Sequence, residues 1–218
     1  YKTTDLYLSG DTYGYGITPP AGSGTAADAT SEFTAGTPWF DGSKVTVSAG
    51  SATLIGKANS VPAQNIAVNV PNQVLGGYET DFKGESVSVS STKITVATSS
   101  GSGTGVLTNV TIVDENGAVV AGPVDADTAG TLLTFTDTIT YPVGKKTYTL
   151  KGKVASAIGN GTIYTLSTAP TTQWTTVRGQ TTGNTITLSQ TSFDMNQMTV
   201  KAAALAVGVS ATPVAQNI

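Results

Sequence analysis

The chain has 218 residues, is 39% hydrophobic and carries a net charge of −3. Only 11% of its residues are charged, against about 25% in average soluble domains. The negative charge disfavours nucleic-acid binding, which needs clustered Lys and Arg. The sequence contains neither Cys nor His, which excludes disulfides, Cys metal sites and the commonest acid–base catalyst. Since no apolar run approaches about 20 residues, we expect no membrane span.

The N-terminal segment, residues 1–44, is rich in Gly and Pro. A short strand is predicted at 6–8, followed by a loop over 13–24, where Pro-Pro and repeated Gly interrupt regular structure. Tyr13 and Tyr15 in this loop have the chemistry to stack on a sugar, although such residues more often cover protein surface. We interpret residues 1–44 as strands and loop of a partial or preceding sandwich unit.

The rest of the chain alternates short apolar stretches with turn signals. Residues 87–96 show the clearest period of two, with Ser and Thr at the outward positions, as in a half-buried strand. Asn116-Gly117 is a strong hairpin signal. Strand spacing of about 8–12 residues predicts an all-β fold, an Ig-like Greek-key β-sandwich with little or no helix. Strands are expected at 45–47, 52–55, 66–70, 74–78, 87–96, 110–114, 118–124, 132–139, 148–154, 161–166, 174–177 and 185–188.

A repeated stretch indicates where one unit begins and ends. Phe40–Ala49 and Phe193–Ala202 share Phe, Asp, Thr, Val and Ala at one offset (193 − 40 = 153). After a slip of one residue, Ala63–Ile66 returns as Ala215–Ile218. A repeat of this length is typical of stacked or arrayed units. It predicts a central unit over 45–197, with 198–218 as the opening strands of the next unit or an inter-subunit strand.

Several stretches resemble Ig-like repeat domains of large bacterial cell-surface proteins, of the surface-layer-like or stalk-like kind. They are Thr111–Val124, Phe135–Asp137, Pro142–Tyr148 and Val209–Pro213. The resemblance covers about residues 64–218 and is specific to a domain type, not to an activity. It implies a secreted, repeated β-sandwich with a structural role.

Oxygen-bearing side chains around one predicted hairpin suit calcium, which prefers carboxylate, amide and carbonyl ligands. The candidate ligands are Asp114, Asn116, Asp125 and Asp127, with Glu115 beside them. Turn formation is the alternative explanation, because such hairpins require Asn and Asp anyway. Calcium is the only cofactor that the sequence suggests.

Paired carboxylates are the remaining candidates for catalysis, since glycosidases use two of them across a cleft. Glu79 and Asp81 form one pair, and Asp125 and Asp127 form another. Solvated loop or edge charges are the favoured interpretation of both pairs. We therefore expect that the chain is not an enzyme.

Covalent modification is a further alternative. Lys93, Lys151 and Lys153 lie on predicted strands, where a buried Lys is able to form an isopeptide bond with Asn or Asp. Exposed Lys that discourages edge-to-edge aggregation is the commoner arrangement. Asn109–Thr111 and Asn160–Thr162 are glycosylation sequons, which are weak signals alone.

The final segment leads to a prediction about assembly. Residues 198–218 match residues 45–66 and would lack the rest of their own sandwich, leaving open edges that pair readily with another chain. Such association runs head to tail and gives open filaments when the rotation does not close. The residues predicted to act in assembly are Thr199, Val200, Leu205, Val207, Val209 and Ile218.

Together these patterns predict a structural subunit or repeat segment of an extracellular bacterial assembly, either a filament or a surface layer. Its partners would be other copies of itself and cell-envelope polysaccharide. Two alternatives stay open, a cell-surface adhesin or carbohydrate-binding module and a non-catalytic part of a secreted enzyme.

Overall fold

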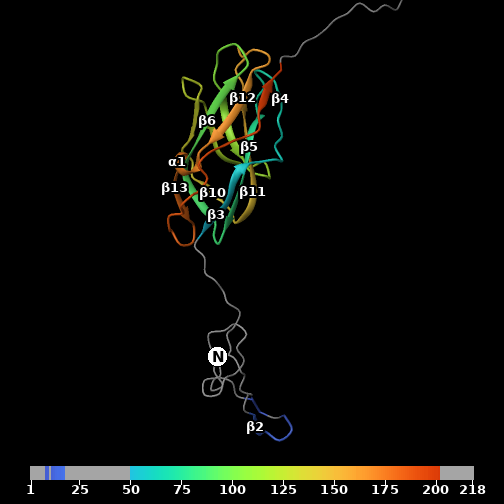
Figure 1. Cartoon of the computed structure of the whole chain (residues 1–218), viewed down its shortest axis with the longest axis vertical. Coiled ribbons are helices and arrows are strands. Elements are labelled where there is room, and N and C mark those ends of the chain that lie inside the picture. The colour runs from blue at the N-terminus through green and yellow to red at the C-terminus, as the bar shows by residue number, and fades with distance from the viewer. Residues whose placement is uncertain (1–7, 10, 18–49, 202–218) are drawn as a thin grey trace, which may run out of the picture. The chain divides into compact units, whose positions relative to one another are not determined.

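The computed structural model describes residues 8–9, 11–17 and 50–201, which fall into two units divided between Val47 and Ser48 (Figure 1). In the first unit, β1 (Leu8–Ser9) and β2 (Gly16–Ile17) form an antiparallel hairpin. Its connecting turn exposes Tyr13 and Tyr15, whose ring centroids lie 6.3 Å apart. The second unit is an all-β sandwich, as predicted.

One sheet of the sandwich is antiparallel throughout, with the strand order β3-β5-β11-β7-β8. Its longest pairing joins β11 to β5, with Tyr148 opposite Tyr78. The turn between β7 and β8 is the predicted Asn-Gly hairpin, in which Gly117 N–H donates to the Asp114 carbonyl at 3.0 Å. The strands are β3 (Ser51–Lys57), β5 (Gln73–Lys83), β7 (Thr108–Val113), β8 (Val119–Val124) and β11 (Gly144–Lys153).

The other sheet is built around β6 (Val87–Ser99), the longest strand in the described part of the chain. Its neighbours are interrupted strands. β9 and β10 follow one edge of β6, β12 and β13 follow the opposite edge, and β14 and β15 follow the outer edge of β12. Their bounds are β9 (Leu132–Phe135), β10 (Ile139–Tyr141), β12 (Ile163–Thr168), β13 (Trp174–Gly179), β14 (Phe193–Asp194) and β15 (Met198–Val200).

A parallel pair ends this sheet. β4 (Gln64–Ile66) lies parallel to β15, whereas the other strand pairs named above are antiparallel. A single helical turn, α1 (Pro170–Gln173), joins β12 to β13, so the expectation of little helix is confirmed for the described residues. No helix in this part of the chain has the length and apolar character needed to cross a membrane.

Aromatic side chains from both sheets fill the centre of the core. The Tyr141 ring stacks on Trp174 with centroids 5.2 Å apart, and the Tyr78 ring stacks on Tyr148 at 5.4 Å. The hydroxyls of Tyr78 and Tyr141 share a hydrogen bond of 2.9 Å. Trp174 Nε1 donates to Thr168 Oγ1 at 3.1 Å. The polar atoms of Tyr78, Tyr141 and Trp174 are therefore hydrogen-bonded inside the core, as burial requires.

Three predicted strands differ from the structure. The strand predicted at 66–70 is wrong beyond Ile66, because Asn69 and Asn72 adopt the left-handed φ values of 59° and 58° and turn the chain. The stretch predicted at 132–139 is divided between β9 and β10. At 185–188 the chain forms only a single bridge, from Thr185 to Arg178. The strand predicted at 45–47 lies outside the described residues.

Candidate assembly site at the ends of the sandwich

A buried carboxylate fastens the chain where it enters the sandwich. Glu85, in the turn between β5 and β6, is 7% exposed and accepts the Thr182 hydroxyl at 2.7 Å. It also accepts the backbone N–H groups of Thr181 at 2.7 Å, Thr182 at 2.9 Å and Gly50 at 3.3 Å. These hydrogen bonds, the Thr182 hydroxyl foremost, hold the pKa of the Glu85 carboxyl below its ordinary value. We call this part of the sandwich the Glu85 end.

The last described strand closes the core where the chain leaves the sandwich, here called the β15 end. Met198 and Val200 are fully buried. Val200 N–H donates to the Thr162 carbonyl at 2.7 Å, and Lys201 N–H donates to the Ile66 carbonyl at 2.8 Å. β15 is therefore held between β12 and β4.

This placement corrects part of the assembly prediction. Thr199 and Val200 are not unpartnered strand residues, because they belong to the same sandwich as β12 and β4. The predicted boundary at 197/198 therefore cuts through the sandwich. Met198 and Val200 are two residues apart, so both side chains point to the same face of the sheet, and both are buried there. The other predicted assembly residues, Leu205, Val207, Val209 and Ile218, lie outside the described residues.

The two ends lie at opposite tips of the sandwich (Figure 1). β6 starts at Val87, next to the Glu85 turn. It ends at Ser99, which pairs with Ile163, and Ile163 pairs in turn with Thr199 of β15. A strand of 13 residues spans about 40 Å. The chain therefore runs into one tip of the unit and out of the other.

The predicted calcium ligands serve as turn formers. Asp114 Oδ1 accepts the backbone N–H groups of Asn116 at 2.9 Å and Ala118 at 2.8 Å, at one end of the β7–β8 hairpin. Asp125 and Asp127 accept backbone N–H groups beyond the other end. Within the described ranges, no three acidic, His or Cys side chains lie close enough to hold a metal together. The four predicted ligands therefore do not form one site.

The carboxylates of the two predicted catalytic pairs contact other groups. Glu79 lies 3.0 Å from the Lys145 ammonium, and Asp81 lies 3.1 Å from the Lys83 ammonium. Both carboxylates stand on β5 and face these Lys side chains. Asp125 and Asp127 lie on the connection after β8 and not on a strand.

Sequence reasoning did not single out Glu85. A Glu in a turn after Lys-Gly is an ordinary surface residue by its sequence context. Its burial depends on donors at Thr181 and Thr182, almost a hundred positions further along the chain. Only the fold brings these groups together, so no local signal would have identified the carboxylate.

Comparisons of the chain with protein-family models, with curated proteins and with solved structures gave no match.

Proposed function

We propose that this chain is a structural segment of an extracellular bacterial assembly. In it, Ig-like sandwich units follow one another head to tail, and strands from two copies pair where one copy ends and the next begins. The observation that carries the proposal is the parallel pair formed by β15 and β4. The sequence equivalents of these two strands occur again near opposite ends of the chain.

The repeat supplies the register of the shared strands. Val45–Val47 corresponds to β15 at the offset of 153, and Gln216–Ile218 repeats the Gln-Asn-Ile of β4 without a change. Inside the described sandwich, β15 and β4 pair with Thr199 opposite Asn65. By this equivalence, Thr46 of one copy would lie opposite Asn217 of another.

Three further features support a structural role. The chain enters and leaves the sandwich at opposite tips, which suits units arranged in a line. The sequence contains neither His nor Cys, and the carboxylates of β5 are paired with Lys. Main-chain pairing at sheet edges gives affinity between copies without a dedicated binding pocket.

A disulfide experiment tests the register directly, because the chain has no native Cys. The double variant Thr46→Cys, Asn217→Cys is expected to form covalent multimers under mild oxidation, since directly paired strand residues lie within disulfide range. Thr46→Cys with Gln216→Cys, one residue out of register, is the matched control. Asn65→Cys with Thr199→Cys is expected to give a disulfide within one copy and serves as the positive control.

Non-reducing electrophoresis measures the outcome. A ladder of multimers from the in-register pair, with little from the control, supports strand sharing between copies. The same yield from both pairs, or only monomer from the in-register pair while the positive control is oxidised, would contradict it.

Carbohydrate binding is the second candidate function. A neutral pocket at the β15 end of the sandwich favours it.

A further inference from the structure

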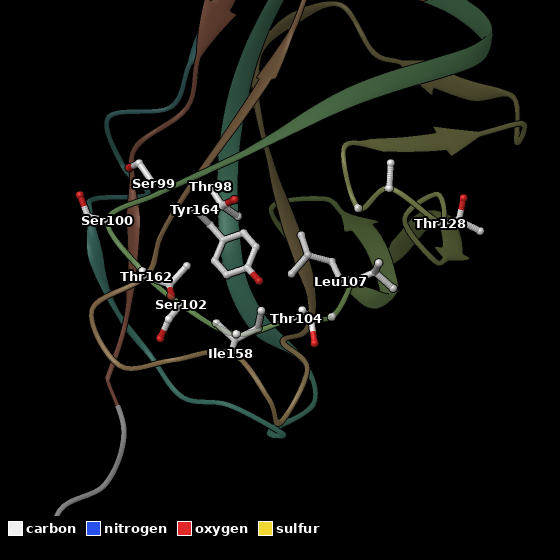
Figure 2. Close-up of a pocket in the computed structure, with 16 residues that line it drawn as sticks. Thr98, Ser99, Ser100, Ser102, Thr104, Leu107, Thr128, Ile158, Thr162 and Tyr164 are labelled. Carbon is white, nitrogen blue, oxygen red and sulfur yellow. The ribbon is translucent and has the colours of Figure 1, made fainter.

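A pocket of about 480 Å³ opens at the β15 end of the sandwich (Figure 2). Its walls come from the end of β6 and the loop that follows it, residues 98–107, from the turn at 128–130, and from residues 158–164 before and within β12. Seven of its 16 lining residues are Ser or Thr, and none is charged. Its volume falls within the range of about 300–1,000 Å³ that is typical of small-molecule sites.

Close backbone packing gives the pocket wall its shape. A Cβ at Gly101 would lie 1.9 Å from Thr162 Oγ1, and a Cβ at Gly103 would lie 1.9 Å from the Ala157 carbonyl oxygen. Gly103 also has a φ of +95°, which side chains rarely allow. Gly159 N–H donates to the Ser102 carbonyl at 2.6 Å. The loop after β6 is therefore fixed against the segment before β12.

The floor of the pocket holds a polar group without a partner. Tyr164 is 2% exposed, and its hydroxyl makes no hydrogen bond to any of the described residues. Figure 2 shows its ring projecting into the pocket, with Leu107 and Ile158 nearby. A buried hydroxyl is normally bonded, and one left unpaired lowers stability. A ligand hydroxyl at this position would satisfy it.

We propose that the pocket binds an uncharged sugar residue. The lack of charged groups favours an uncharged ligand, and the hydroxyls of the rim are able to exchange hydrogen bonds with several sugar hydroxyls. Tyr164, Leu107 and Ile158 border the pocket with apolar atoms, and they are 2%, 1% and 9% exposed. The Tyr164 hydroxyl gives the hydrogen bond at the floor. This inference is independent of strand sharing, because the pocket lies wholly within the described sandwich.

The test uses the full chain and four neutral probes, the methyl glycosides of glucose, galactose, mannose and N-acetylglucosamine. Each is supplied at about 10 mM, which saturates most of a site with a millimolar Kd. Saturation-transfer NMR and the melting temperature report binding. At least one probe is expected to bind saturably and to raise the melting temperature, since a ligand of the native state stabilises it. Glucuronate is the charged comparison and is expected to bind more weakly.

Tyr164→Phe removes the hydroxyl and keeps the ring. It is expected to weaken binding of the best probe by about tenfold, while the ligand-free melting temperature stays unchanged or rises. Tyr15→Phe makes the same change at an exposed ring outside the sandwich and should bind as the parent does. The proposal is overturned if no neutral probe binds, if glucuronate binds equally well, or if Tyr164→Phe binds unchanged.

Discussion

At Glu85 a charged side chain is held almost out of contact with water, yet each of its oxygens accepts two hydrogen bonds. Oε1 accepts Gly50 N–H and the Thr182 hydroxyl, and Oε2 accepts two backbone N–H groups. Because the native state binds the ionised form, the pKa of the carboxyl lies below its ordinary 4.5. This bonding links the arriving chain, the β5–β6 turn and the loop after β13.

Glu85 therefore makes stability depend on pH in a defined direction. A lowered native pKa means that its contribution is complete above 4.5 and is lost as pH falls through the native value. Asp114 and Asp127 have pKa values lowered in the same direction, so the wild type alone does not isolate Glu85.

The comparison that isolates it is urea unfolding of the wild type and Glu85→Gln across the acid range. The variant should be less stable at neutral pH, and the gap should narrow below pH 4.5. If the difference in unfolding free energy between the two proteins stays constant with pH, the ionised form of Glu85 is not what stabilises the fold.

The hydrogen bond between Tyr78 and Tyr141 makes a second residue-scale prediction. Tyr141→Phe leaves the Tyr78 hydroxyl without this partner in the core and should reduce the free energy of unfolding by about 1–2 kcal/mol. Replacing both by Phe should reduce it by less than the sum of the two single changes, because neither hydroxyl is then left unpaired. Denaturant titrations of the wild type, the two single variants and the double variant give the coupling free energy between the two hydroxyls. Strict additivity would show that the bond contributes nothing.

At the scale of elements, β15 completes the sandwich although it has only three residues. Met198→Ala should reduce the free energy of unfolding by about 2–5 kcal/mol, because its side chain is fully buried. Val119→Ala, at a position 58% exposed on β8, should change it by no more than about 0.5 kcal/mol. Equal effects at the two positions would mean that β15 is not packed in solution.

The strands with a strong local pattern could be predicted from the sequence. The apolar alternation of Val87, Val89, Ile94 and Val96 is buried along β6, and the Asn-Gly turn joins β7 to β8. The interrupted strands could not be predicted. A break such as the one between β9 and β10 depends on which residues pair with β6, and a strand partner distant in sequence leaves no local pattern. The polar stretch of β4 has no alternation at all, and only its pairing with β15 makes it a strand.

In the candidate sites, too, local features could be predicted from the sequence, whereas features that depend on distant contacts could not. Residues 100–105 are all Gly, Ser or Thr, a composition typical of a loop, and the structure forms a loop there. Its role as a pocket wall depends on contacts with residues 157–162, which no local pattern reveals. The unpaired hydroxyl of Tyr164 is likewise a property of the packed fold.

At the scale of the whole molecule, the corrected position of β15 changes how assembly should be tested. Removing residues 202–218 deletes the proposed shared strand and keeps every core residue of the described sandwich. We expect this truncation to leave the unfolding transition unchanged and to abolish head-to-tail multimers, as followed by sedimentation velocity. Removing 199–218 should instead destabilise the sandwich itself, because Val200 is lost from the core. Multimers that persist after removal of 202–218 would contradict strand sharing.

The entry and exit of the chain at opposite tips of the sandwich also have a mechanical consequence. Tension applied between the two tips acts along the direction of β6, which runs from the Glu85 end to the β15 end, so neighbouring strands must slide past one another before the unit opens. Opening frees about 150 residues, each spanning up to about 3.4 Å when extended, which adds roughly 500 Å of length. In the proposed head-to-tail assembly, each opening would add that length and so lower the force on the units that remain folded.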